Sequence, residues 1–269
     1  MDPIRPERLK ELAAEVVAAS PAHETEVVWD VSCDRFARFA SSGPTQSADR
    51  VVPRVQVRVR VEREGGLGEA SAVSDTLDLG GAKAALERAL QLAGHGAVSG
   101  DLVPLGGAVD APLSHGDPGV LDQGFEVMAG WIERAISGCE ESDLSPAGLA
   151  QLTHSGRAIV NSAGRAVCGS TSRAALSLTA SDPGGGGAGF GDAISQRAGG
   201  VDVERVIHRA VSKGVMNRSP QGIEPGRYTV VLEPNAVSSL LLFAGYQGLG
   251  AQDVAEEASF LCGRRGEQA

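Results

Sequence analysis

The sequence predicts an α+β fold, in which antiparallel sheets pack against helices. Two observations predict the sheets. Apolar and polar residues alternate strictly from Arg54 to Glu62, and two β-rich stretches between 149 and 180 are joined by turn-forming residues, Asn161–Gly164. The third observation concerns order. The strands follow one another in hairpins and do not alternate singly with helices, which is typical of antiparallel sheets with one wet face.

The first 40 residues predict a helix followed by strands. From Glu7 to Ser20, apolar residues recur at helical spacing opposite a charged face. Two stretches with strand character, 24–32 and 35–40, come next and end at the turn-forming run Ser41–Pro44. The apolar stripe of the helix consists of Leu9, Leu12, Ala13, Val16 and Val17.

The strand predicted from Arg54 to Glu62 has valines on one side and mainly basic residues on the other. Such a basic stripe is either a ligand-binding face or, more commonly, a solvated face with acidic partners nearby. Gly65–Gly66 then predicts a turn into a strand over 67–77, followed by a helix over 83–93. The valines are Val55, Val57, Val59 and Val61, and the other side carries Arg54, Gln56, Arg58, Arg60 and Glu62.

Composition and pattern divide residues 1–222 into three segments. Residues 1–93 form an N-terminal α+β unit, and 94–119, rich in Gly, Pro, Asp and Ser, form a linker or long loop. Residues 120–222 contain a central helix and the hairpin region. Further elements are predicted as a helix over 120–137, a glycine loop over 184–191, a helix over 201–215, a strand over 228–232 and a helix over 235–249.

Charge and apolar content exclude several classes of protein. A formal net charge of −10 opposes binding to a phosphate backbone, because that affinity depends on Lys and Arg. We see neither a membrane-spanning apolar stretch nor a signal peptide, so we expect a cytoplasmic protein. The four cysteines have no C-x-x-C spacing, so we expect reduced, buried thiols at Cys33, Cys139, Cys168 and Cys262.

Few residues suggest chemistry by themselves. Gly184, Gly186 and Gly189 match G-x-G-x-x-G, but they lie in a glycine-rich run outside any βαβ unit, so we expect a flexible surface loop. His115 and Asp117 are two positions apart in the linker, where a mobile loop is poorly suited to hold a metal. The remaining histidines, His23, His95, His154 and His208, show no metal-ligand spacing.

Several sequence blocks, taken in order, resemble the TldD/PmbA metallopeptidase family, also called modulators of DNA gyrase. The likeness is clearest in PGRYTVVLEPNAV, residues 225–237. It implies a TldD/PmbA-type N-terminal domain followed by the start of a second, β-rich C-terminal domain over 223–269. The other blocks are Arg38–Ala40 leading to Gln46, residues 55–70, residues 88–93 and residues 159–164.

The resemblance also implies what this chain lacks. Catalytic members of the family carry H-E-x-x-x-H on the helix that follows residues 225–237, where two histidines bind zinc and the glutamate activates water. The aligned positions here are Leu242, Phe243 and Gln247, which cannot do this chemistry. We therefore expect no catalytic and no metal-binding residue in this chain. We also expect the predicted helix over 235–249 to be packed in a core. This pattern is similar to the TldE/PmbA-like branch.

The resemblance implies a non-catalytic subunit of a cytosolic zinc metallopeptidase complex that degrades or processes small or unfolded peptides. Zinc is expected on a TldD-type partner in a heterodimer, and we expect peptides to bind by strand addition at a sheet edge. The residues that bind substrate stay unknown. Two alternatives stay open: a regulatory interaction protein of a DNA gyrase or antitoxin system, and an active metallopeptidase with an unfamiliar site that uses His154 or His208.

Members of the family continue into a longer second domain, whereas this sequence stops soon after the helix over 235–249. We therefore expect the C-terminal domain to be truncated. A fragment, a truncated gene product and a short paralogue all fit this expectation.

Overall fold

The protein is described by a computed structural model that covers residues 5–41, 43–100, 102–109, 116–264 and 266–267. The chain divides into two compact units, Met1–Pro220 and Gln221–Ala269. The first unit contains one seven-stranded antiparallel sheet with helices packed against it, so the predicted α+β fold is confirmed.

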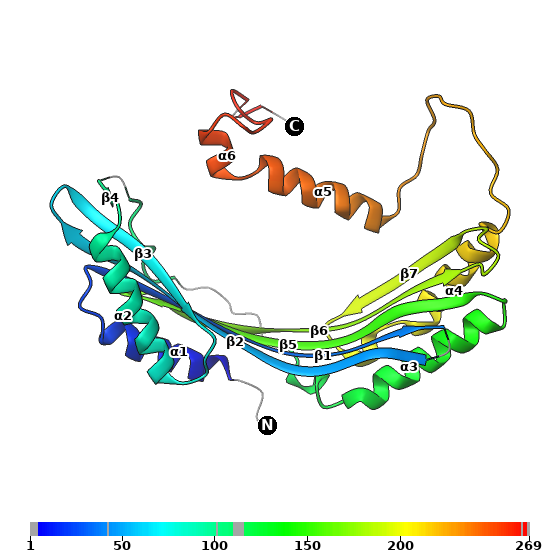
Figure 1. Cartoon of the computed structure of the whole chain (residues 1–269), viewed down its shortest axis with the longest axis horizontal. Coiled ribbons are helices and arrows are strands. Elements are labelled where there is room, and N and C mark those ends of the chain that lie inside the picture. Colours follow the sequence, from blue (N-terminus) through cyan, green and yellow to red (C-terminus); the bar gives the residue numbers. More distant parts are fainter. Residues whose placement is uncertain (1–4, 42, 101, 110–115, 265, 268–269) are drawn as a thin grey trace. The chain divides into compact units, whose positions relative to one another are not determined.

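The sheet has the strand order β4-β3-β2-β1-β5-β6-β7 (Figure 1). Its centre is β1, which pairs with β2 on one side and with β5 on the other along almost its whole length. The segments expected as 1–93 and 120–222 therefore share one continuous sheet. The strands are β1 Glu24–Ala40, β2 Gly43–Arg63, β3 Gly66–Ser74, β4 Val98–Ser99, β5 Ser145–Asn161, β6 Ala166–Ser181 and β7 Ala188–Ser195.

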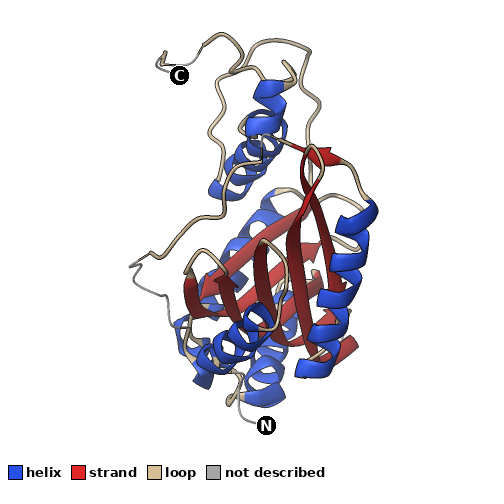
Figure 2. Ribbon diagram, turned by 90° about the vertical axis from the view of Figure 1, so that its left-hand side faces the viewer, coloured by secondary structure: helices blue, strands red, loops and turns tan. Residues whose placement is uncertain are grey.

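All four long helices of this unit lie on the same face of the sheet. In Figure 1, α1 and α2 lie against one end of the twisted strands and α3 and α4 against the other, and Figure 2 shows the helices beside the sheet. The acidic residues Asp78 and Asp202 cap α2 and α4 by accepting hydrogen bonds from backbone N–H groups. The helices are α1 Pro6–Ala18, α2 Leu79–His95, α3 Gly124–Glu140 and α4 Val203–Met216.

The covered face of the sheet contains two separate cores. One lies under α1 and α2, where Trp29 is fully buried on β1. The other lies under α3 and α4 and includes Trp131. The alanine side of α2 lets that helix approach the valines of β2 closely. These alanines are Ala82, Ala85, Ala89 and Ala93, and the facing valines are Val55, Val57 and Val59.

Several predicted boundaries are wrong. The stretches 24–32 and 35–40 form one strand, and β2 begins at Gly43, well before Arg54. Part of the predicted glycine loop over 184–191 is a strand, β7. At Gly189, an added Cβ would lie 2.0 Å from the backbone oxygen of Ala210 in α4. The glycine is therefore a packing requirement, because only a residue without a side chain lets α4 approach β7 this closely.

The linker contains little regular structure in its described part. Its β4 strand, Val98–Ser99, pairs with β3, and the backbone N–H of Gly116 donates to the carbonyl of Ser170 on β6. His115 lies outside the described residues, so the His115 and Asp117 pair is not described.

The described part of the second unit contains two helices, α5 Pro234–Gly248 and α6 Ala251–Ala255. Residues 228–232 are not a strand, contrary to the prediction. We expected α5 to pack in a core, but Leu241, Leu242 and Phe243 are 66%, 56% and 63% exposed. The described part of this unit offers too few other elements to cover the helix. No helix in the described ranges is long and apolar enough to span a membrane.

Candidate functional site

The face of the sheet opposite the four helices carries most of the polar side chains of its strands. We call it the open face. Because side chains alternate along a strand, even-numbered residues of β1 and β2 and odd-numbered residues of β5 and β6 project from it. This face contains the arginines of the strand that the sequence singled out as a basic stripe.

Two of those arginines have acidic partners, as expected for a solvated face. Arg58 Nη2 lies 2.7 Å from Glu26 Oε1. Arg60, only 6% exposed at its side chain, contacts Glu24 Oε2 at 2.7 Å and Glu69 Oε2 at 2.6 Å. Arg54 differs, because it is exposed and has no ion-pair partner among the residues that the structure describes. The basic stripe is therefore neutralised at one end and unpaired at the other.

The most connected carboxylate of the open face is Asp34 on β1. Its side-chain oxygens accept hydrogen bonds from Arg50 Nη2 at 2.9 Å, Gln151 Nε2 at 2.6 Å and Thr153 Oγ1 at 2.9 Å. Burial raises the pKa of the Asp34 carboxyl, but these hydrogen bonds outweigh burial and hold the pKa below its usual value. Asp34 therefore stays ionised and, from β1, fixes side chains of both neighbouring strands, β2 and β5.

A hollow of about 960 Å³ lies over the middle of the open face. Its floor includes a row of hydroxyl groups across three strands, Ser32, Ser155 and Thr171, and Ser155 donates to Ser32 at 2.9 Å. Apolar side chains flank the polar floor. The open-face residues of the lining are Val28, Asp30, Ser32, Val52, Arg54, Gln56, Ser155, Arg157, Ile159, Val167, Gly169 and Thr171.

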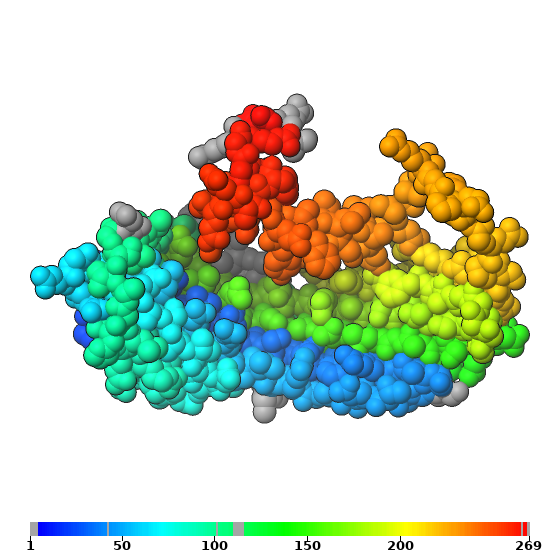
Figure 3. Space-filling model, turned by 45° about the horizontal axis from the view of Figure 1, so that its top comes forward, coloured from blue at the N-terminus to red at the C-terminus, as the bar shows by residue number. Residues whose placement is uncertain are grey.

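The first half of β2 is a free edge of the sheet. β3 pairs with β2 only from Val55 to Arg63, so residues 43–54 have β1 on one side and no described strand on the other. This edge lies at the surface, in the blue part of the space-filling view (Figure 3). An apolar groove of about 640 Å³ runs beside it, between Pro44 and Ser47 of β2 and Phe125 and Ile132 of α3. A free edge with an adjacent groove suits the addition of an extended peptide.

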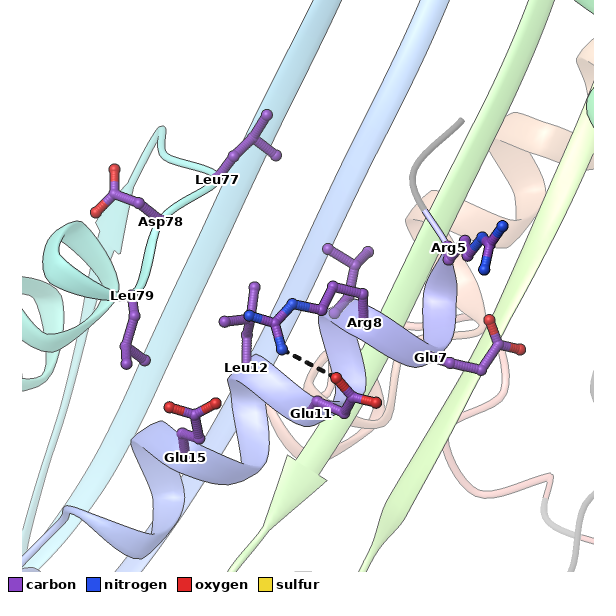
Figure 4. A pocket seen from close by; sticks show the side chains of 10 residues that line it. Arg5, Glu7, Arg8, Glu11, Leu12, Glu15, Leu77, Asp78 and Leu79 are labelled. Atoms are coloured by element: carbon purple, nitrogen blue, oxygen red, sulfur yellow. Dashed lines mark hydrogen bonds and ion pairs between the residues drawn. The ribbon is translucent and has the colours of Figure 1, made fainter. Parts of the chain in front are cut away.

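A further hollow, of about 780 Å³, lies between α1 and the start of α2 (Figure 4). Its charged groups serve the helices themselves. Arg8 and Glu11 form an exposed ion pair at 2.9 Å, and Asp78 accepts the capping hydrogen bond from Gly81 at 2.8 Å. We assign no ligand to this hollow.

The two histidines considered for an active hydrolase lie in different surroundings. His208 is exposed on α4, beside the ion pair between Arg134 and Glu204. His154 is 5% exposed on the covered face of β5, and its Nδ1 atom has no hydrogen-bond partner in the described structure. Across the described residues, no three His, Cys, Asp or Glu side chains are grouped so that they hold a metal. The structure therefore does not bring these histidines together into a site.

His154 predicts how stability changes with pH. Burial lowers the pKa of His154 below 6.5, and the nearby Asp117 carboxylate only partly opposes this effect. As the pH falls, the unfolded chain binds a proton at this residue before the folded protein does. The contribution to stability is therefore complete above pH 6.5 and decreases as the pH falls towards the folded-state pKa. We expect His154→Leu to reduce the pH dependence of the unfolding free energy, measured by urea titration, in this range.

The companion variant Asp117→Asn should act in the opposite direction. Without the carboxylate, the pKa of His154 falls further, so the dependence on pH becomes steeper. If the unfolding free energy changes equally with pH in the wild type and in both variants, this role of His154 is contradicted.

The cysteines match the expected thiols only in part. All four are free; Cys139 and Cys168 are buried, but Cys33 and Cys262 are half-buried. Burial raises the pKa of the Cys139 thiol to about 11, so this thiol stays neutral and unreactive at physiological pH.

Sequence reasoning did not find the open-face hollow. Its polar lining comes from β1, β2, β5 and β6, and only the pairing of β1 with β5 brings these side chains together. The one signal in the sequence was the basic stripe of β2, which includes Arg54. The three positions that align with the zinc motif of catalytic family members, Leu242, Phe243 and Gln247, all lie on α5, and none is a zinc ligand suited to hydrolysis.

Comparison with known proteins identifies the fold. No family model matches the sequence, and no curated protein matches it. Among solved structures, TldE from Thermococcus kodakarensis has a TM-score of 0.72 at 16% identity, and the alignment covers 97% of this chain and 58% of that chain. A protein from Thermotoga maritima, described as a modulator of a DNA gyrase, has a TM-score of 0.72 at 14% identity, and the alignment covers 95% of this chain and 59% of that chain.

A similar protein from Bacteroides thetaiotaomicron, also described as a modulator of DNA gyrase, has a TM-score of 0.75 at 15% identity, and the alignment covers 96% of this chain and 60% of that chain. This chain thus spans about three fifths of the length of the three structures. Both the α+β architecture and the resemblance in sequence agree with these neighbours. The chain has the fold of TldE and of the modulators of DNA gyrase, the fold that its resemblance to the TldD/PmbA family predicts.

Proposed function

We propose that this chain is a non-catalytic, TldE-like subunit of a cytoplasmic metallopeptidase complex, and that it holds extended peptides for a zinc-bearing TldD-type partner. The observation that carries the proposal is the combination of a TldE-like fold with Leu242, Phe243 and Gln247 at the positions of the zinc motif. Zinc would supply the activated water on the partner, and this chain would supply binding and orientation.

The free edge of β2 supports the binding role. Over residues 43–54, outward-facing backbone N–H and C=O groups are available to pair with an extended peptide, whatever its sequence. The groove beside Phe125 and Ile132 offers apolar contact to side chains of the added strand that project towards α3. Recognition through backbone groups fits a complex that acts on small or unfolded peptides of varied sequence.

Native mass spectrometry of the tagged chain, purified from its own host, tests the assignment directly. We expect a heterodimer in which zinc stays with the partner after dissociation. We also expect that the isolated chain retains no stoichiometric zinc and cleaves no peptide, whereas the complex cleaves an unfolded test peptide. Hydrolysis or stoichiometric zinc in the isolated chain would contradict the proposal.

The descriptions of two structural neighbours favour one alternative, a regulatory role towards DNA gyrase. The same experiment separates the two functions. Recovery of gyrase subunits or an antitoxin, without any metal-bearing protein, would favour the regulatory role and contradict a peptidase complex.

A further inference from the structure

The middle of the open face is positively charged, although the chain as a whole has a net charge of −10. Five arginines project from this region, against the three carboxylates of Asp30, Asp34 and Asp192. The excess of positive charge is local, because Arg58 and Arg60 at the β3 end are matched by glutamates. The five arginines are Arg38, Arg50, Arg54, Arg157 and Arg173.

Three of these arginines have no carboxylate partner among the described residues. Arg38 lies over the ring of Phe36, with its guanidinium carbon 6.0 Å from the ring centroid. Arg173 donates to the neutral amide oxygen of Gln151 at 2.6 Å. Arg54 is exposed at the rim of the hollow and has neither kind of contact. The positive charge of these three guanidinium groups is therefore not neutralised by a described carboxylate, and a ligand can supply carboxylates to them.

The strand register arranges the charges in two parallel rows. In one row, Arg54, Asp30, Arg157 and Gly169 lie side by side across β2, β1, β5 and β6. The second row crosses the same four strands and consists of Arg50, Asp34, Thr153 and Arg173. The rows are four residues apart along each strand, or about 13 Å. The first row crosses the middle of the hollow, and the second lies just outside its lining. An extended ligand along the strands therefore meets positive charge at two levels about 13 Å apart.

The hydroxyl row of Ser32, Ser155 and Thr171 lies between the two charged rows. Hydroxyl groups donate to carboxylates or to peptide carbonyls. Asp30 and Asp34 do not repel an acidic ligand strongly, because each is already bound to an arginine: Asp30 to Arg157 and Asp34 to Arg50.

We propose that this part of the open face binds acidic, extended peptide segments, with carboxylates four residues apart contacting the two arginine rows. In an extended chain, side chains at positions i and i+4 lie on the same side and about 13 Å apart, which matches the row spacing. The further claim that such a peptide is part of a peptidase substrate rests on the proposed function. Binding of the peptide is a property of this chain alone, so the binding site and the peptidase role can be disproved separately.

A single-stranded nucleic acid fits this surface less well. Bases need aromatic rings on which to stack. Phe36, an aromatic side chain of this face, is already covered by Arg38 and by Arg50, whose guanidinium carbon lies 5.5 Å from the ring centroid. The net charge of −10 further opposes a ligand that carries one phosphate per nucleotide.

Fluorescence anisotropy with a labelled peptide of alternating Asp and Thr tests the proposal on the full chain. We expect binding that weakens as the ionic strength rises, and at least about tenfold weaker binding of the matched peptide with Asn in place of Asp. The double variant R54Q/R173Q should bind the acidic peptide at least about tenfold more weakly. Both residues are exposed and lack carboxylate partners, so the variant should fold, as checked by circular dichroism and thermal melting.

The matched control is R8Q/R205Q, which removes the same charge from α1 and α4 on the covered side of the sheet. We expect this control to bind like the wild type. Equal loss in both double variants, equal binding of the Asn peptide, or tighter binding of a single-stranded oligonucleotide would overturn the proposal. Binding of the acidic peptide without any metallopeptidase partner in the host would leave this site intact and overturn only its peptidase role.

Discussion

Replacing Trp29 by alanine is expected to lower the free energy of unfolding by about 3–5 kcal/mol, the largest effect of any single change considered for this protein. Trp29 is fully buried on β1, in the core under α1 and α2. Its cross-strand neighbours are Val55 and Ala158, neither of which has a side chain large enough to fill the space that the indole leaves. The loss amounts to a large part of the 5–15 kcal/mol that typically stabilises a domain.

Trp29→Phe is the matched control for this prediction. The indole Nε1 of Trp29 is buried without a hydrogen-bond acceptor in the described structure. Phenylalanine keeps an aromatic ring and removes this unsatisfied donor, so its cost should be well below that of alanine. Guanidinium unfolding followed by circular dichroism measures both. A loss from Trp29→Phe as large as that from Trp29→Ala would contradict the packing argument.

The alanine variant also tests whether the two cores unfold together. The chain has two tryptophans, and the other, Trp131, lies in the core under α3 and α4. Its fluorescence therefore reports on the core that the substitution does not touch. Because the same long strands form the base of both cores, we expect the Trp131 transition to shift to lower denaturant together with the circular dichroism transition. A Trp131 transition that does not move would show that the two halves unfold separately.

Gly189→Ala is expected to be the second most damaging change, with a loss of about 1–3 kcal/mol. The new Cβ atom would lie 2.0 Å from the carbonyl oxygen of Ala210 and 2.4 Å from the amide nitrogen of Gly214, both in the backbone of α4. Backbone atoms of a helix cannot move aside as a flexible side chain can. The helix must therefore shift away from β7, which opens the core around Val206.

Gly130→Ala is expected to change the free energy of unfolding in the opposite direction, in the same half of the protein. Gly130 lies within α3, and its added Cβ would meet no atom within 4 Å. Alanine also loses less conformational entropy than glycine when a helix forms, so we expect a gain of about 0.5–1 kcal/mol. Thermal melting of both variants checks the pair. A neutral Gly189→Ala would mean that α4 does not approach β7 as closely as described.

The contrast between these glycines shows what could be predicted from sequence. Helices α1, α2 and α4 follow from apolar periodicity, and the hairpin of β5 and β6 follows from alternation and its turn. Glycines usually interrupt strands, so the run over 184–191 predicts a loop, and nothing local reveals that a helix backbone packs on Gly189. The first half of β2 is hard to predict for a similar reason. Residues 43–54 mix polar and apolar residues without strict alternation and contain two prolines, and pairing with β1 makes them a strand.

The candidate site was beyond local reasoning for another reason. Gln151 and Thr153 both donate hydrogen bonds to Asp34 in the fold, yet each lies more than a hundred positions after Asp34 in the sequence. The alternation of β2 correctly suggested that Arg58 and Arg60 have acidic partners. It could not separate them from Arg54, because the partners come from β1 and β3 in a register that the sequence does not show.

The pairing of β1 with β5 also constrains the order in which the protein folds. The hydrogen bond from the backbone of Thr25 to the hydroxyl of Ser162 joins residues 137 positions apart. During synthesis, the hairpin of β1 and β2 is complete long before β5 leaves the ribosome, and β1 then exposes a second long unpaired edge. Contacts between residues this distant in sequence also form slowly. The nascent chain thus passes through a stage at which its central strand is open to wrong partners, and binding of a chaperone to that strand would be most useful before residue 161 emerges.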